Sequence, residues 1–224
     1  STLLASSAAS DVYKRQVHNA VHFDRGAGLR TNMERHTKEI KKAANYMRGK
    51  KKKNEFEQIA LGAVDTFFRE ADEASRNINS KRFDERFDRM EQTNELVHGS
   101  YNYHNVFLDV GNGGNAVTNF EKCHNDCQVA DLYQFLRKVM EKHDWNINVA
   151  YRLVDEYDRL KPLEDDDIDM LVTLLSFPEK FWKIINQYYN AGKAWVPAKN
   201  IDKLKIVIEQ NMRRRELIDK MCGM

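Results

Sequence analysis

Residues 96–121 read LVHGSYNYHNVFLDVGNGGNAVTNFE. An apolar pair leads the chain into a corner at His98 and Gly99, and Asn105 begins a run of strand-forming residues. The Gly/Asn-rich residues 111–115 are typical of a turn that reverses the chain. The stretch therefore predicts a β-hairpin that lies behind a polar loop.

This pattern resembles the catalytic loop and metal-binding segment of the aminoglycoside phosphotransferase and choline kinase branch of the protein-kinase-like fold. In that family a His-Gly-Asp loop carries the catalytic base, an Asn further along binds a metal ion, and an Asp after the hairpin binds metal again. Here His98, Gly99 and Asn105 match the pattern. Ser100 stands where the resemblance implies the base Asp, and Asn119 where it implies the metal-binding Asp.

Both departures remove negative charge from the site that the resemblance implies. A serine hydroxyl is a poor general base at neutral pH, and an amide brings no charge to Mg²⁺, which prefers hard, charged oxygens. Because phosphoryl transfer depends on those electrostatics, the loop is predicted to be inherited but inactive, as in a pseudokinase. We expect no catalytic residue, cofactor or bound metal, and we interpret Ser100, Asn105 and Asn119 as degenerate positions of the family site.

The composition is that of a soluble globular domain, with 42% hydrophobic and 31% charged residues among 224. A net charge of +2, from 36 basic and 34 acidic residues, provides no broad field for nucleic acid or an anionic membrane. No apolar run has the length of a membrane span, and the odd count of three cysteines favours a reducing compartment. The sequence therefore predicts one cytoplasmic domain without a nucleic-acid partner.

The beginning of the chain differs from the rest. Residues 1–16 share no periodicity with the remainder of the sequence, and residues 11–16 resemble a translated sequencing-adapter tail. We therefore expect residues 1–16 to be a non-native or disordered leader, and residues 17–224 to form the kinase-like domain. Residues 17–28 are interpreted as the remnant of a helix.

Apolar residues at helical spacing predict helices over most of the chain. Thr31, with Glu34 completing a capping box, is the predicted start of the first helix, which ends at Gly49; Asn54 caps the second. A third helix over residues 80–92 is expected to bury three apolar side chains: Phe83, Phe87 and Met90. Further helices are predicted from Asp131 and over residues 148–160, 165–176, 178–190 and 201–221.

Several side-chain groups have a functional and a structural interpretation. The lysines at 50–53 and the arginines at 213–215 are interpreted as solvated surface. Aromatic residues of the last helices are expected to pack between helices: Trp182, Tyr188, Tyr189 and Trp195. Cys123, His124 and Cys127 invite a zinc interpretation, but zinc needs four ligands and Cys222 is far away. We therefore predict an irregular loop over residues 122–128.

The family resemblance also gives Asp131 a role. It implies that this carboxylate braces the loop through backbone amides, so that His98, Gly99 and Asp131 are structural. The alternative is an acidic residue that stabilises the start of its own helix. The spacing favours the bracing role.

Two longer segments narrow the resemblance. Residues 119–123 with 131–138, and residues 174–190, are similar to the CotS family of bacterial spore coat proteins, and the likeness extends over about residues 17–217. That family implies a kinase-like fold and association with the endospore coat. It would place the chain in the mother-cell cytoplasm, assembled on the spore coat with other coat proteins.

Complete family members also have an upstream β-rich lobe with a Gly-rich phosphate loop, a strand Lys and a helix Glu, and this sequence contains none of these. We therefore expect a mainly α chain with a small β-hairpin. It would be the helical C-terminal lobe of a protein-kinase-like, aminoglycoside phosphotransferase-type fold, truncated at its N-terminus.

Two functions are consistent with the sequence. The first is a spore coat structural or assembly protein on a degenerate kinase-like scaffold. The alternative is an ATP-dependent small-molecule phosphotransferase in which Glu121, with Asn105, reaches the metal and His98 or His104 takes over proton transfer. Because adjacent side chains of a strand point to opposite faces, that use of Glu121 requires a local bulge after Asn119.

Overall fold

The structure, a computed structural model, describes residues 28–110, 114–191 and 198–223. The predicted leader, residues 17–27 of the helix remnant, and Trp195 lie outside these ranges. The described chain forms two compact units. Unit one contains Ser80–Leu174, and unit two contains residues 30–79 together with residues 175–223.

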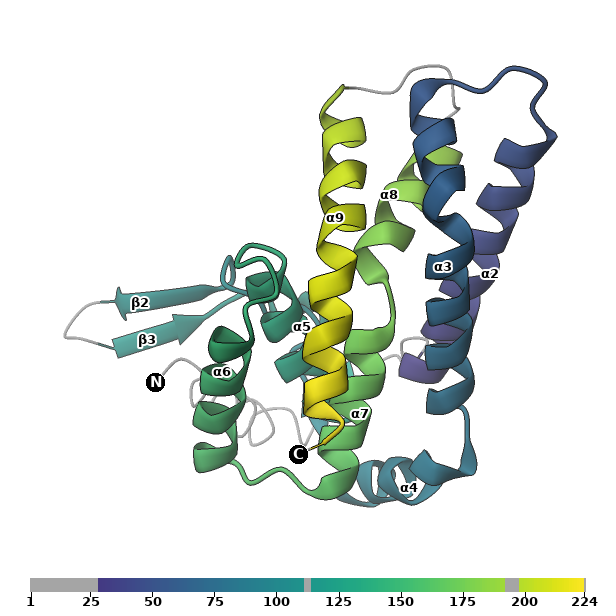
Figure 1. Cartoon of the computed structure of the whole chain (residues 1–224). Helices are drawn as coiled ribbons and strands as arrows, with labels where there is room; N and C mark the ends of the chain where they lie inside the picture. The colour runs from purple at the N-terminus through teal and green to yellow at the C-terminus, as the bar shows by residue number, and fades with distance from the viewer. Residues whose placement is uncertain (1–27, 111–113, 192–197, 224) are drawn as a thin grey trace. The chain divides into compact units, whose positions relative to one another are not determined.

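Unit two is a bundle of long helices that run side by side (Figure 1). α9 packs against α3 and α8, and the rings of Phe67 and Phe181 stack with their centroids 4.0 Å apart. The predicted packing role holds for Trp182, whose indole nitrogen donates to Glu39 at 2.7 Å and whose ring stacks on His36. The helices are α2 (Leu29–Gly49), α3 (Glu55–Ile78), α8 (Glu179–Asn190) and α9 (Ala198–Met221).

The helix starts in unit two test two capping predictions. Asn54 caps α3, as predicted, and it also forms a full capping box with Glu57, which was not predicted from the sequence. The cap predicted at Thr31 is wrong, because α2 already begins at Leu29. Arg30 donates to the carbonyl of Ile78 at 2.9 Å, which holds this additional first turn against α3.

Two basic runs are less solvated than predicted. Lys51 and Lys52 are exposed, but Lys50 lies 2.6 Å from the fully buried carboxylate of Glu57. Arg214 is only 5% exposed, and its guanidinium donates to the carbonyls of residues 175 and 176 and to Glu70. A buried guanidinium is tolerated because acceptors surround it.

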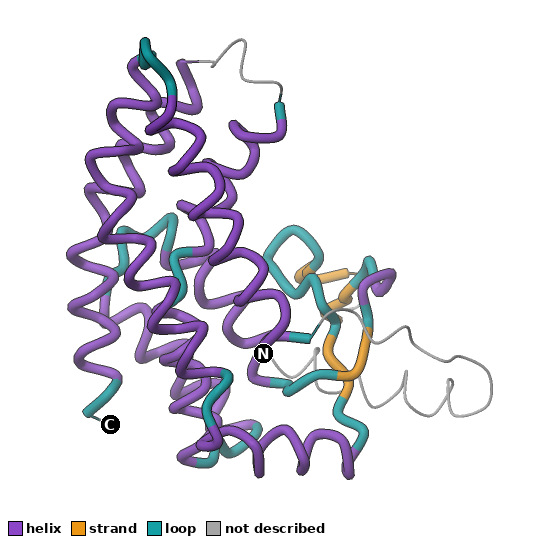
Figure 2. Tube along the Cα trace, turned by 90° about the vertical axis from the view of Figure 1, so that its right-hand side faces the viewer, coloured by secondary structure: helices purple, strands orange, loops and turns teal. Residues whose placement is uncertain are grey.

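Unit one combines short strands with helices. Its strands form two separate antiparallel pairs, β1 with β4 and β2 with β3, drawn in orange in Figure 2. The β2–β3 pair confirms the predicted hairpin, with Val106 opposite Val117. The elements are η1 (Lys81–Phe83), α4 (Asp84–Thr93), β1 (Leu96–Val97), β2 (Val106–Val110), β3 (Gly114–Val117), η2 (Phe120–Lys122), β4 (His124–Asn125), α5 (Val129–Met140), α6 (Ile147–Leu160) and α7 (Asp165–Ser176), whose last two residues belong to unit two.

The segment predicted as an irregular loop over residues 122–128 is more ordered than expected. His124 and Asn125 form β4, which pairs with Val97 and Leu96. Two-residue strands carry no periodicity, so this pairing depends on contacts across about 30 residues. The β1–β4 pair fixes the position of Val97, directly before the corner at His98.

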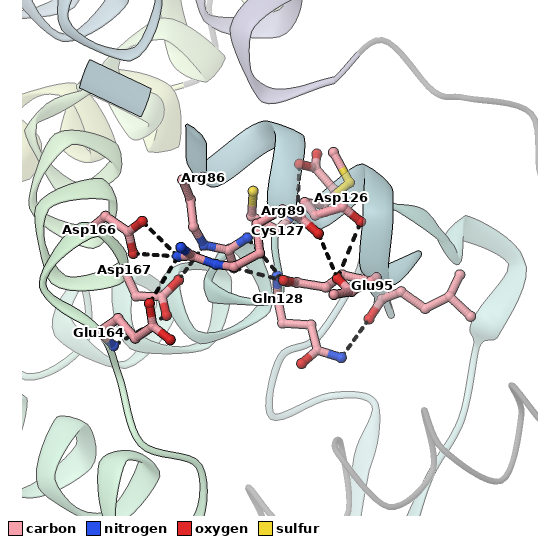
Figure 3. Close-up of polar contacts among 12 residues, drawn as sticks. Arg86, Arg89, Glu95, Asp126, Cys127, Gln128, Glu164, Asp166 and Asp167 are labelled. Atoms are coloured by element: carbon pink, nitrogen blue, oxygen red, sulfur yellow. Dashed lines mark hydrogen bonds and ion pairs between the residues drawn. The ribbon is translucent and has the colours of Figure 1, made fainter. Parts of the chain in front are cut away.

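α4 buries a charged residue where apolar ones were expected. Phe83 is fully buried, but Phe87 and Met90 are only half-buried, and the buried residue of α4 itself is Arg86. Arg86 makes a double hydrogen bond to Glu95, at 2.9 Å each, and donates to Asp167 at 2.7 Å (Figure 3). These charge-assisted hydrogen bonds offset the cost of removing the guanidinium from water.

A row of arginines on η1 and α4 therefore faces the acidic start of α7. Arg82 pairs with Asp169, and Arg89 pairs with Asp166 at 2.6 Å, beside the Arg86 contacts seen in Figure 3. Glu95 lies directly before β1, and it also accepts a hydrogen bond from the backbone of Gln128 at 2.9 Å. This network fixes the strand pair from which the polar loop begins. In the described part of the chain, no helix is both long and apolar enough to cross a membrane.

Candidate functional site

The polar loop, residues 98–105, begins where β1 ends and leads into β2. Gly99 has φ +70°, in the left-handed region that favours glycine. A Cβ at this position would lie 2.1 Å from the carbonyl oxygen of Lys122 and 3.0 Å from a ring nitrogen of His124. The loop therefore touches the β4 side so closely that only glycine fits.

Asp131, at the start of α5, contacts this corner directly. Its carboxylate accepts hydrogen bonds from the backbone N–H of His98 at 2.6 Å and of Gly99 at 3.1 Å. Burial raises the pKa of Asp131 from 3.8 to about 6, and the two backbone hydrogen bonds oppose that rise. The structure therefore brings together the three residues for which the resemblance implied a bracing role.

His98 is engaged through both ring nitrogens. Nε2 lies 2.8 Å from the carbonyl oxygen of Thr118, and Nδ1 accepts the backbone N–H of Ser100 at 3.2 Å. Since a carbonyl only accepts and an N–H only donates, the ring carries its proton on Nε2 and is neutral. Burial lowers the pKa of His98, and the hydrogen bond to Thr118 offsets part of this effect. This geometry gives His98 a structural task.

The three degenerate positions are joined by hydrogen bonds. The side-chain nitrogen of Asn105 donates to the carbonyl of Ser100 at 2.8 Å, with the Ser100 hydroxyl 3.4 Å away. Because that nitrogen faces two oxygens of Ser100, the amide oxygen of Asn105 faces the other way. It accepts the side-chain nitrogen of Asn119 at 2.7 Å. We call this arrangement of Ser100, Asn105 and Asn119 the amide relay.

Backbone hydrogen bonds run beside the amide relay. The N–H of Thr118 donates to the carbonyl of Asn105 at 3.0 Å, and the Thr118 carbonyl accepts from His98. The polar loop is thus joined to the segment after β3 by hydrogen bonds from His98, Thr118 and Asn119.

The sequence suggested that the strand continues through residues 119–121, but the segment after β3 leaves the strand conformation. Asn119 has φ +65° and ψ +54°, and residues 120–122 form the 3-10 helix η2. Asparagine tolerates this left-handed conformation better than most residues. Glu121 therefore lies exposed on η2, so the bulged strand that the alternative function required is absent here. His104 is also exposed, and its ring centroid lies 4.2 Å from that of Tyr103.

The residues present do not fit a Mg²⁺ ion. The only side-chain oxygen of Asn105 already accepts Asn119, and neither residue carries a charge that would compensate the dehydration of Mg²⁺. Among the described residues, no group of three or more His, Cys, Asp or Glu gathers in a way that could hold a metal ion. Burial raises the pKa of Cys123 to about 11 and of Cys127 to about 12, which keeps both thiols protonated.

Sequence reasoning missed two contributors to this site. Tyr101 lies inside the polar loop and is fully buried, with its ring centroid 5.6 Å from that of Phe135. Arg86 supports the β1–β4 pair through its hydrogen bonds to Glu95. The signal for Arg86 was present, because arginines at 82, 86 and 89 repeat at helical spacing and an acidic run occupies 164–169.

Comparison with known proteins identifies the fold. No protein-family model matches the sequence, and no curated protein sequence matches it. The crystal structure of an aminoglycoside phosphotransferase from Alicyclobacillus acidocaldarius subsp. acidocaldarius is similar, with a TM-score of 0.78 at 16% sequence identity. The match covers 87% of this chain and 57% of that chain.

This likeness confirms the predicted fold class. The chain is mainly helical, carries small antiparallel β pairs, and has the kinase-like fold of an aminoglycoside phosphotransferase. It spans 57% of the length of that structure.

Proposed function

We propose that this chain is a structural or assembly protein of the bacterial spore coat, built on a kinase-like scaffold without phosphotransferase activity. In this proposal it acts in the mother-cell cytoplasm and assembles on the spore coat with other coat proteins. It uses neither ATP nor Mg²⁺. The observation that supports the loss of phosphotransferase activity is the amide relay, in which Ser100 and Asn119 stand at the positions where the family resemblance implies acids.

Two features of the polar loop support the absence of phosphoryl transfer. Ser100 offers a hydroxyl in place of a carboxylate base, and the neutral ring of His98 uses both nitrogens inside the protein. General-base catalysis typically supplies on the order of 10²–10⁴ in rate, and one electrostatic contact on the order of 10²–10³. Lacking both, the scaffold is expected to turn over substrate at background rates.

The spore coat assignment is supported by sequence resemblance. Residues 119–123 with 131–138, and residues 174–190, carry the likeness to the CotS family. The second segment includes α8, whose side chains Phe181, Ile184, Ile185 and Tyr188 are buried within unit two. Its resemblance is therefore to a helix that shapes the fold, and the coat partners would be recognised by other surfaces.

Activity is tested on the purified full chain with ATP, Mg²⁺ and a panel of amino-alcohol and sugar acceptors. The native protein is compared with a Ser100→Asp/Asn119→Asp double variant and with Asn115→Asp, a matched change at an exposed position of β3. We expect no Mg²⁺-dependent turnover in the native protein or in the Asn115→Asp control. Mg²⁺-dependent turnover that disappears on Glu121→Ala would establish the alternative, a compensated phosphotransferase.

Localisation is tested separately with a fluorescent fusion of the chain in a sporulating bacterium. We expect a shell around the forespore and recovery of the protein in coat extracts of purified spores. A uniform signal throughout the mother cell, with none in coat extracts, would contradict the coat assignment whatever the activity assay shows.

A further inference from the structure

Asn105 and Asn119 occupy positions where the resemblance implies metal ligands, and the contact between them has a task of its own. We propose that Asn105 and Asn119 form a neutral clamp, independent of any divalent cation, that holds the polar loop against the segment after β3. This goes beyond the proposed function, because it concerns how the loop keeps its shape and does not depend on the coat assignment.

The clamp is specified by donor and acceptor types. Asn105 must present its nitrogen to the two oxygens of Ser100, and it therefore presents its oxygen to Asn119. A carboxylate at 119 would place oxygen against oxygen at a contact that is now 2.7 Å. Reversing the Asn105 amide does not relieve this, because its oxygen would then face the carbonyl of Ser100.

The surroundings make this contact matter. Asn105 is only 6% exposed, whereas Asn119 is exposed, so the Asn105 amide oxygen depends on the Asn119 side chain for its hydrogen bond within the protein. The adjacent hydrogen bond from the Thr118 N–H to the Asn105 carbonyl depends on the same two segments staying together. Opening the clamp should therefore expose the Thr118 N–H to solvent exchange.

The matched pair of substitutions is Asn119→Asp and Asn115→Asp. Both exchange one exposed amide for a carboxylate, but Asn115 lies on β3 outside the clamp. Aspartate tolerates the left-handed backbone of residue 119 much as asparagine does, so the change isolates the side-chain contact. A third protein, Asn105→Ala/Asn119→Asp, is compared with Asn105→Ala, in which the opposing oxygen is already gone.

The readouts are thermal unfolding of the full chain and hydrogen exchange at Thr118, each in EDTA and in Mg²⁺. For Asn119→Asp in EDTA we expect a melting temperature lowered by about 4 °C and exchange at Thr118 about tenfold faster. Asn115→Asp should match the native protein. In the Asn105→Ala background, Asn119→Asp should have little further effect, and the native protein should melt at the same temperature in EDTA and in Mg²⁺.

Three results would overturn the clamp. One is an Asn119→Asp protein as stable as Asn115→Asp, and another is an undiminished effect of Asn119→Asp when Asn105 is already alanine. The third is a native protein that Mg²⁺ stabilises. All three concern stability, so they are read independently of turnover and localisation.

Discussion

The polar loop is held from two sides that differ in chemistry. On one side the buried carboxylate of Asp131 accepts two backbone N–H groups, and on the other the amide relay joins Asn105 to Asn119 without charge. The family resemblance implies acids on both sides, but this chain keeps only the acid that contacts backbone. The shape of such a loop and its catalytic chemistry therefore depend on different side chains. The loop can keep its shape after the catalytic acids are lost.

The most severe test of the backbone-contacting side is Gly99→Ala. The new Cβ would lie 2.1 Å from the Lys122 carbonyl, at a φ of +70° that alanine resists. Strain and overpacking together should lower the free energy of unfolding by about 4 kcal/mol, measured by chemical denaturation. Gly62→Ala on α3, where a Cβ meets nothing within 4 Å, is the control and should not destabilise. Equal stability of the two variants would mean that the corner is looser than described.

The next largest effect is expected for Asp131→Ala. It leaves the N–H groups of His98 and Gly99 without their acceptor at a site where Asp131 is only 6% exposed. The free energy of unfolding should fall by about 3 kcal/mol, with faster hydrogen exchange at both amides. Asp155→Ala, an exposed change on α6, is the control. A loss under about 1 kcal/mol would remove the distinction between the two sides of the loop.

The charge on one side predicts a pH dependence that the other side lacks. Because burial raises the pKa of Asp131 from 3.8 to about 6, the folded protein binds this proton more tightly than the unfolded chain. The free energy of unfolding contributed by Asp131 should therefore fall by about 2 kcal/mol as the pH rises from 4 to 6. Denaturation of native and Asp131→Asn protein across this range measures it. The other titrating groups are common to both proteins, so parallel curves would contradict the expectation.

The smallest effect is expected for Ser100→Asp alone. Ser100 is half-buried, and the Asn105 nitrogen faces its hydroxyl, so a carboxylate there meets a donor. Stability should stay within about 0.5 kcal/mol of native, unlike Asn119→Asp, where a carboxylate meets an acceptor. Thermal unfolding of the two single variants compares them directly. A large loss for Ser100→Asp would show that the whole relay resists charge, not only its Asn105–Asn119 contact.

Much of the fold could be predicted because its signals are local. Helical periodicity predicted the helices, the Gly/Asn-rich residues 111–115 predicted the hairpin, and Asn54 caps α3 as the sequence indicated. The Thr31 cap failed because a distant contact, from Arg30 to Ile78, extends the helix by a turn. Patterns within a short stretch of sequence do not reveal a contact between residues 48 positions apart.

The candidate site was less predictable for the same reason. The residues of the polar loop were identified from their types, but the left-handed backbone of Asn119 and the η2 helix result from the loop contacts they make. The helical spacing of the arginines indicated a charged face at Arg86, but its burial results from ion pairs with Glu95 and with Asp167 on α7, which local patterns do not reveal. On the same helix Phe87 and Met90 are only half-buried.

The division of the chain also bears on the order in which it is made. Most of unit one is a single run of sequence, Ser80–Leu174, and its long contact from Arg86 to Asp167 spans 81 residues. Unit two joins the two flanks, and its contact from Tyr188 to Glu57 spans 131 residues. During synthesis α2 and α3 can pack on each other, but the faces that contact α8 and α9 must wait, uncovered, until those helices have left the ribosome. Unit one is expected to fold while they wait, and chaperones that shield exposed helices should engage this chain early.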